Sequence, residues 1–92
     1  MVRLVEIYET PKGHILREIY VNPKHIISLR EDMRLKTKLS EGLSLEGLDE
    51  NHCFTKVVLD RGSVGLEIIV VGTPSQVETK LQENMERRLL NG

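Results

Sequence analysis

The feature that most constrains the fold is the stretch Phe54–Leu81, FTKVVLDRGSVGLEIIVVGTPSQVETKL. It begins with a run rich in β-branched residues, which predicts a strand, and a turn with two glycines follows. The run Leu66–Val71 is almost continuously apolar, as is typical of a central strand covered on both faces. Thr73–Gln76 then combines a capping Thr, a Pro at the first helical position and the Gln of a capping box. The stretch therefore predicts strand, turn, buried strand and helix in succession.

Three runs before this stretch predict the rest of a sheet. Residues 2–8 and 15–21 are rich in Val, Ile and Leu, and the Pro and Gly of Thr10–Gly13 mark a turn between them. These two strands are expected to pair as an antiparallel hairpin. Residues 22–25 (NPKH) predict a bend with a short helical turn, and a third strand is expected to begin with residues 26–29.

The segment 33–40 alternates apolar or small residues with polar ones. A period of two predicts a strand with one apolar face and one basic face. Residues 41–51 carry two glycines and several acids, which predicts a loop with a helical turn near Ser44–Leu48. This loop also holds three leucines, too apolar for a solvated linker, so we expect them either to pack on the body of the protein or to meet a partner: Leu43, Leu45 and Leu48.

Together these segments predict one α+β domain over residues 1–92, because 92 residues form a single small core. A small antiparallel twisted sheet or open barrel of about five strands is expected, with one C-terminal helix (73–90) packed on it. The N-terminus lacks a signal-peptide core, and no run approaches the length of a membrane span. The single Cys cannot form an intrachain disulfide, which fits the cytoplasm.

Two pieces of the chain resemble the small flagellar and swarming-motility proteins of the FlbD type (SwrD-like). One is Arg17–Leu29, REIYVNPKHIISL, with Tyr-Val-Asn-Pro followed by paired Ile residues; the other is Phe54–Leu81, which contains V-x-G-T-P-x-x-V-x-x-K-L. The resemblance covers roughly half of the chain, and the insertion 31–53 departs from it. It implies a short β-meander closed by one helix and a non-enzymatic role. Small accessory proteins of phages and bacteria use the same kind of scaffold.

No catalytic or metal-binding motif is present in the sequence. His52 and Cys53, near Asp49, are the only local cluster of His, Cys and acid, and it is too small for a structural zinc site. Adjacent residues of a strand point to opposite faces, so His52 is a poor activator of Cys53. The glycines match neither a dinucleotide-binding nor a P-loop pattern. We therefore expect no catalytic residue, metal or cofactor; a small enzyme using Cys53 and a histidine is the third-ranked alternative.

Thirteen basic and fourteen acidic residues give a formal net charge of −1, which offers no global attraction to nucleic acid or an anionic membrane. Three aromatic residues are too few for a base-stacking platform. The segment 30–38 nevertheless forms a basic stripe. Such a stripe is able to contact phosphates, or it marks an exposed strand whose cations discourage edge pairing.

We therefore expect a non-enzymatic, small binding or regulatory protein that acts as a homo-oligomer and takes a protein partner or an anionic ligand. The alternative is a nucleic-acid or nucleotide binder that uses the basic stripe. The expected partner or ligand residues are Arg30, Arg34, Lys36, Lys38, Leu43, Leu45 and Leu48. The apolar stripe of the C-terminal helix also supplies an expected oligomer interface, formed by Leu81, Met85 and Leu89.

Overall fold

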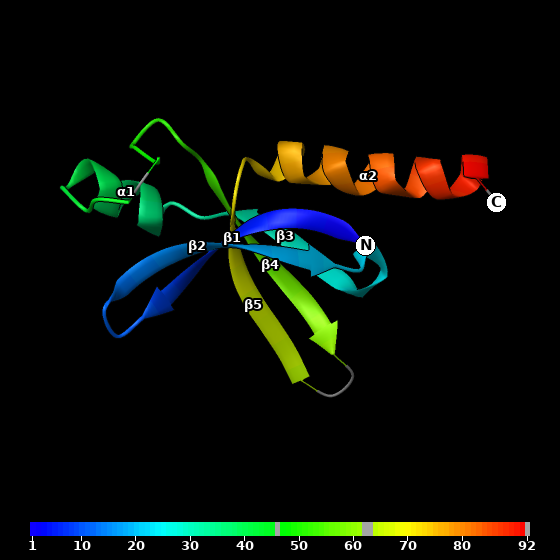
Figure 1. Cartoon of the computed structure of the whole chain (residues 1–92), viewed down its shortest axis with the longest axis horizontal. Helices are drawn as coiled ribbons and strands as arrows, with labels where there is room; N and C mark the ends of the chain where they lie inside the picture. The colour runs from blue at the N-terminus through cyan, green and yellow to red at the C-terminus, as the bar shows by residue number, and fades with distance from the viewer. Residues whose placement is uncertain (46, 62–63, 92) are drawn as a thin grey trace.

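In the computed structural model the described residues form one antiparallel sheet of five strands, with two α-helices (Figure 1). The structure describes residues 1–45, 47–61 and 64–91, without the side chains of residues 61, 64 and 84–91. The strands are β1 (Val2–Thr10), β2 (Gly13–Val21), β3 (Ile26–Glu31), β4 (Phe54–Arg61) and β5 (Val64–Val71), arranged in the order β2-β1-β5-β4-β3. The predicted α+β class is confirmed, and the sheet is open rather than closed into a barrel.

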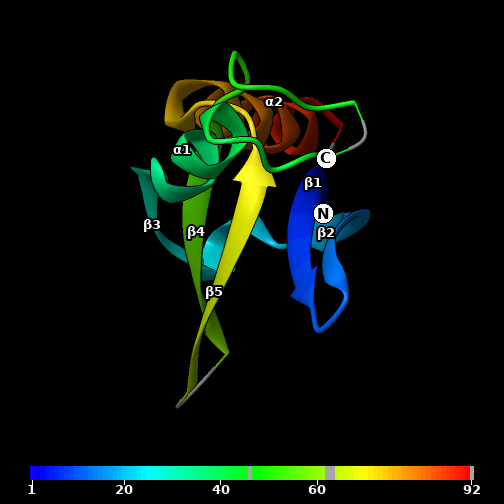
Figure 2. The ribbon, with the colours of Figure 1, turned by 90° about the vertical axis from the view of Figure 1, so that its left-hand side faces the viewer.

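Two hairpins build the sheet, and they meet along a short seam. β1 pairs with β2 over its whole length, from Val2 opposite Val21 to Thr10 opposite Gly13, which confirms the predicted first hairpin. β4 pairs with β5 in the same way. Between the hairpins, β1 pairs with β5 at Glu6–Val70 and Ile7–Ile69. The hairpins therefore splay apart on either side of this seam (Figure 2).

One face of the sheet packs against α2 (Pro74–Asn91), which confirms the expected C-terminal helix. The predicted capping box is present: the Gln76 N–H donates to Thr73 Oγ1 at 3.1 Å, and the Thr73 N–H donates to Gln76 Oε1 at 2.9 Å. This start places Val77 against the sheet, with Leu81 packed beside it. The buried residues on this face are Val2, Leu4, Val21, Val57, Leu59, Ile68, Val70 and Val77.

The opposite face packs against α1 (Arg34–Ser40) and the loop that follows it. Its buried residues are Ile7, Leu35, Leu39, Leu45 and Phe54. Alternate side chains of β5 enter the two cores, because Ile68 and Val70 face α2 while Ile69 and Val71 face α1. The prediction that this apolar strand is covered on both faces is confirmed.

The predicted strand over residues 33–40 is wrong, because Arg34–Ser40 form the helix α1 and Met33 is its N-cap. Leu35 and Leu39 are buried, whereas Met33 and Thr37 are exposed. The Thr37 N–H donates to the Met33 carbonyl at 3.0 Å, a helical spacing of four residues. Leucines four residues apart share one face of a helix and also one face of a strand, so the alternation alone did not separate the two structures.

The predicted bend before β3 is a 3-10 helix, Pro23–His25. The Lys24 N–H donates to Asn22 Oδ1 at 3.0 Å, so the Asn side chain fixes the entry into this turn. The turn leads into β3, whose register against β4 shifts between Ile26 and Ser28.

Candidate functional site

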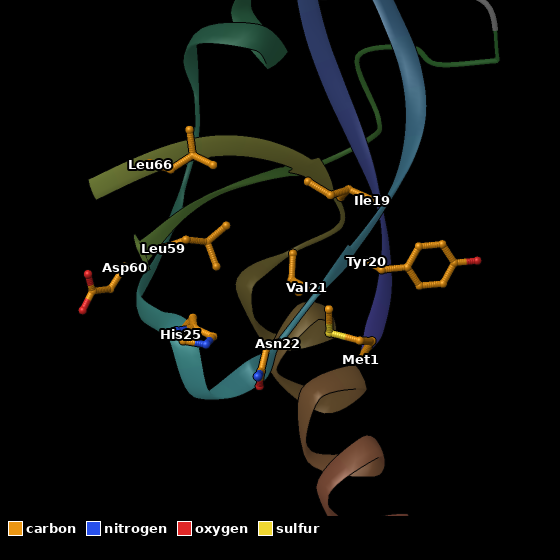
Figure 3. Close-up of a pocket in the computed structure, with 9 residues that line it drawn as sticks. All are labelled: Met1, Ile19, Tyr20, Val21, Asn22, His25, Leu59, Asp60 and Leu66. Carbon is orange, nitrogen blue, oxygen red and sulfur yellow. The ribbon is translucent and has the colours of Figure 1, made fainter. Parts of the chain in front are cut away.

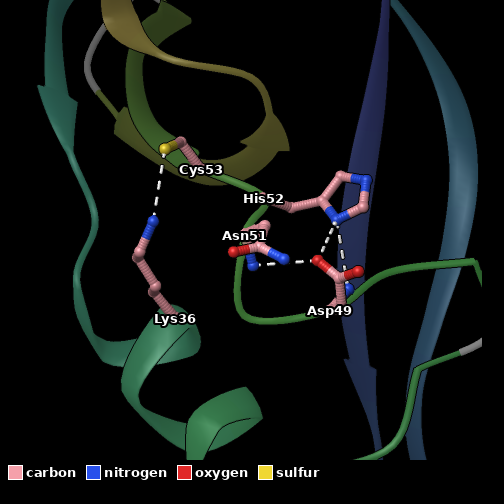
Figure 4. Close-up of polar contacts among 5 residues, drawn as sticks. All are labelled: Lys36, Asp49, Asn51, His52 and Cys53. Atoms are coloured by element: carbon pink, nitrogen blue, oxygen red, sulfur yellow. Dashed lines mark hydrogen bonds and ion pairs between the residues drawn. The ribbon is translucent and has the colours of Figure 1, made fainter.

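The predicted basic stripe is dispersed in the structure. Arg30 lies in β3, opposite Lys56 of β4. In α1, Arg34 and Lys38 are four residues apart and share a face, while Lys36 points elsewhere. Its Nζ lies 3.5 Å from Cys53 Sγ (Figure 4). The alternation that would align these cations on a strand separates them on a helix, so they form no continuous track for a polyanion.

Arg34 and Lys38 instead line a pocket of about 150 Å³ between α1 and the end of the first hairpin. The apolar part of its wall is Ile7, Leu35 and Ile69, and the polar part is Glu9, His14, Asp32, Arg34 and Lys38. Sequence reasoning did not associate His14, Glu9 and Asp32 with the cations, because the hairpin and the helix meet only in the fold. Two cations and two carboxylates give this pocket both signs of charge.

Asp32 is buried at the rim of this pocket. Its Oδ1 accepts the Arg34 N–H at 3.2 Å, at the start of α1. The Asp32 N–H itself donates to the Phe54 carbonyl at 2.9 Å, which ties the helix start to β4. The carboxylate therefore fixes the start of α1, and the backbone of Asp32 ties that start to β4.

The three leucines of the loop pack on the body of the protein, which was one of the two expectations for them. Leu45 is 8% exposed and belongs to the core under α1, and the half-buried Leu43 and Leu48 pack against the same core. For Leu45 to contact a partner directly, this core would have to open.

The expected interface on α2 is described only at its first residue. Leu81 is half-buried and packs against the core between α2 and the sheet. The side chains of Met85 and Leu89 lie outside the described residues.

The His52–Cys53 cluster is held by contacts within the loop (Figure 4). His52 Nδ1 lies 3.0 Å from Asp49 Oδ1, and the Asn51 N–H donates to the same oxygen at 2.8 Å. The Asn51 N–H first, and then His52, hold the pKa of Asp49 below its ordinary value of 3.8. Cys53 contacts Lys36 rather than His52. Among the described residues, no group of three or more His, Cys, Asp or Glu side chains is placed to hold a metal ion.

A larger pocket, of about 390 Å³, lies between the end of β2, the 3-10 helix and the second hairpin (Figure 3). Its wall is mainly apolar, with Ile19, Val21, Leu59 and Leu66. Figure 3 shows Tyr20 and Asp60 directed outwards on opposite sides of it. The pocket offers apolar surface, but its polar groups do not converge on one point.

The free edge strand β2 carries three of the large hydrophobic residues that are exposed among those described. β2 is an end strand of the sheet, nine residues long, and its register against β1 runs without a shift. Ile15, Leu16 and Tyr20 are 48%, 40% and 59% exposed, and the exposed Tyr8 lies opposite Ile15 on β1. The sequence did not identify this edge, because which strand ends a sheet depends on pairing between distant segments.

The two charged residues of β2 are held back from its free edge. Arg17 Nε donates to Glu6 Oε1 at 2.7 Å, and the guanidinium lies 3.7 Å from the centre of the Tyr8 ring. The hydrogen bond to buried Glu6 raises the pKa of Arg17. The neighbouring Glu18 is 3.5 Å from Arg3, also on β1. These contacts direct both side chains toward β1.

The opposite edge, formed by β3, is built differently. This strand has six residues, an irregular register at Ile26–Ser28, and a charged end at Arg30 and Glu31. Short strands, bulges and charges are the devices by which proteins discourage edge-to-edge pairing. β2 is longer and regular, and its two charged residues, Arg17 and Glu18, are bound to residues of β1.

Comparison of the chain with protein-family models, with curated proteins and with solved structures finds no match. Within the described ranges, no helix is both long enough and apolar enough to cross a membrane.

Proposed function

We propose that this chain is a small, non-enzymatic binding protein that acts as a homo-oligomer, with the free edge of β2 as its surface of association. The observation that carries this proposal is the contrast between the two edges of the sheet. A long, regular, apolar edge offers unpaired backbone groups as a template for another strand. The edge of β3 is protected against such pairing, whereas that of β2 is not.

The size of the chain supports association. A domain of 92 residues buries a smaller fraction of its surface than a larger one, and pairing through β2 adds buried apolar area. The side chains that gain most from burial are those already exposed there: Ile15, Leu16 and Tyr20. The scaffold resemblance to FlbD-type proteins supports a non-enzymatic role.

The mass of the protein in solution tests the proposal. Light scattering is expected to give at least twice the chain mass of 10.5 kDa. Leu16→Lys places a cation on the free edge and is expected to shift the mass toward the monomer. Ile27→Lys is the matched control, because Ile27 is 63% exposed on the protected edge. A wild-type mass of 10.5 kDa at every concentration, with a native circular dichroism spectrum, would refute the proposal.

A second candidate function is the binding of a small charged ligand such as a nucleotide in the pocket beside α1. It is favoured by one observation, that Arg34, Lys38 and His14 line the same cavity. Calorimetric titration with AMP is expected to show binding that Arg34→Ala and Lys38→Ala each weaken. Lys36→Ala is the control, because this lysine contacts Cys53 instead. Equal AMP affinity in all three variants, or no binding to the wild type, would exclude this candidate.

A further inference from the structure

We propose that two copies of the chain pair their β2 strands in antiparallel fashion about a two-fold axis, with Arg17 opposite Arg17 of the second copy. The two five-stranded sheets then continue into one another. This inference rests on the proposed self-association and adds its geometry. This register follows from the two-fold symmetry and from the length, the side-chain shapes and the charges of β2.

Symmetry restricts the possible registers. An antiparallel pair of identical strands in one continuous sheet is related by a two-fold axis perpendicular to the sheet. After this rotation the same face of each copy lies on the same side of the joined sheet. Residues opposite one another point to the same face, and faces alternate along a strand. A residue of β2 therefore opposes a residue of the same parity, so each allowed register centres on one residue facing its own copy.

Strand length selects among these registers. β2 runs from Gly13 to Val21, and its middle residue is Arg17. Centring the pair on Arg17 matches the whole strand, with Gly13 opposite Val21 of the second copy. Moving the centre by one residue shifts the register by two and leaves two residues of each strand without partners. Because backbone pairing is the main attraction of an edge, the full overlap is favoured.

The register centred on Arg17 also matches the side chains on the α2 side of the sheet. Ile15 falls opposite Ile19 of the second copy, and the two-fold axis makes this contact twice. Ile15 is exposed, whereas Ile19 already packs at the border of the core under α2. The pairing therefore extends an existing apolar cluster across the interface.

On the α1 side, an exposed aromatic falls opposite a hollow. His14, Ile15, Leu16 and Leu45 line a hollow of about 390 Å³ beside the start of β2. In the proposed register, Tyr20 of the second copy lies opposite His14, at the edge of this hollow. Tyr20 has an exposed ring that gains from burial, and its hydroxyl is able to remain at the wet rim.

The central charges are compatible with this register. Two facing arginines would repel each other if their guanidinium groups lay at the edge. Each Arg17 is instead bound at 2.7 Å to buried Glu6 and lies over the Tyr8 ring, directed back over its own β1. The competing register, centred on Glu18, would place two carboxylates opposite each other. Each Glu18 has only an exposed contact with Arg3, at 3.5 Å, to offset this repulsion.

Disulfide crosslinking distinguishes the registers. All variants carry Cys53→Ser, which removes the native thiol. Ile15→Cys and Ile19→Cys chains are prepared separately and mixed under mild oxidation. Opposite residues of a strand pair lie within the Cα–Cα separation of about 7 Å that a disulfide spans, while diagonal neighbours lie at or beyond it. The mixture is expected to form a covalent heterodimer, and each chain alone to crosslink far less. A Glu18→Cys chain, which faces itself in the competing register, is expected to remain largely uncrosslinked.

Three other outcomes would overturn the inference, and each would remove a different part of it. Efficient crosslinking of Glu18→Cys without the mixed heterodimer would replace the register and keep β2 as the interface. A dimeric mass without crosslinking in any variant would exclude both the register centred on Arg17 and that centred on Glu18, while self-association itself stands. A monomeric mass for the uncrosslinked protein would refute the proposed function as well.

Discussion

Leu45→Ala tests whether the loop after α1 belongs to the core or serves as a free surface for a partner. Leu45 is 8% exposed and packs in the core under α1 with Leu35, Leu39 and Phe54. The substitution removes three carbons, worth about 0.8 kcal/mol each. Collapse of the loop offsets part of any cavity penalty, so the expected loss is about 2–3 kcal/mol, at the lower end of the range for buried leucines. Such a loss is a large part of the roughly 5–14 kcal/mol expected for a domain of this size.

The assay is urea unfolding followed by far-ultraviolet circular dichroism, because the chain has two Tyr and no Trp to report by fluorescence. Wild type and variant are compared at one protein concentration, since association shifts apparent stability. In a separate thermal unfolding experiment, the melting temperature of the variant is expected to fall by about 10–20 °C. Ser44→Ala, at an exposed neighbouring position, is expected to change little, and Leu43→Ala to lie between the two. A change of less than about 0.5 kcal/mol for Leu45→Ala, as for an ordinary surface substitution, would refute the core assignment.

Two further predictions concern local hydrogen bonds. Thr73→Ala removes the side-chain acceptor for the Gln76 N–H and is expected to destabilise the protein by about 1 kcal/mol in urea unfolding, an effect that Thr73→Ser should largely reverse. Asp49→Asn addresses acid stability. The pKa of Asp49 is lowered in the folded state, so its carboxylate stabilises the fold above about pH 4, and this contribution is lost as the pH falls through the folded pKa. The urea midpoint of the wild type should therefore fall more steeply in acid than that of the variant; parallel profiles would contradict this assignment.

Local patterns were enough to predict most elements of the fold. The hairpin turn at Thr10–Gly13, the bend at residues 22–25 and the capping box at Thr73–Gln76 all form as predicted. Each depends on residues that interact within a few positions of one another. Their identities therefore specify the structure before any tertiary contact is made.

The segment 33–40 shows where local pattern is insufficient. Leu35 and Leu39 satisfy both periods, and the choice of helix follows from how they meet the core under α1. The helix also separates the cations of the predicted basic stripe. Helical geometry places Arg34 and Lys38 in one pocket and turns Lys36 toward Cys53.

By itself, the sequence determined that the chain forms a small antiparallel sheet with a capped C-terminal helix, since turns, caps and apolar runs are short-range properties. The tertiary structure decided which strand is left at the edge, because β1 lies beside β5 through pairing between residues more than sixty positions apart. It also brought Glu6 and Tyr8 to Arg17, which removes a charge from that edge. The candidate surface of association depends on both decisions, because an edge becomes available only when neighbouring strands pair elsewhere and its charges find partners within the fold.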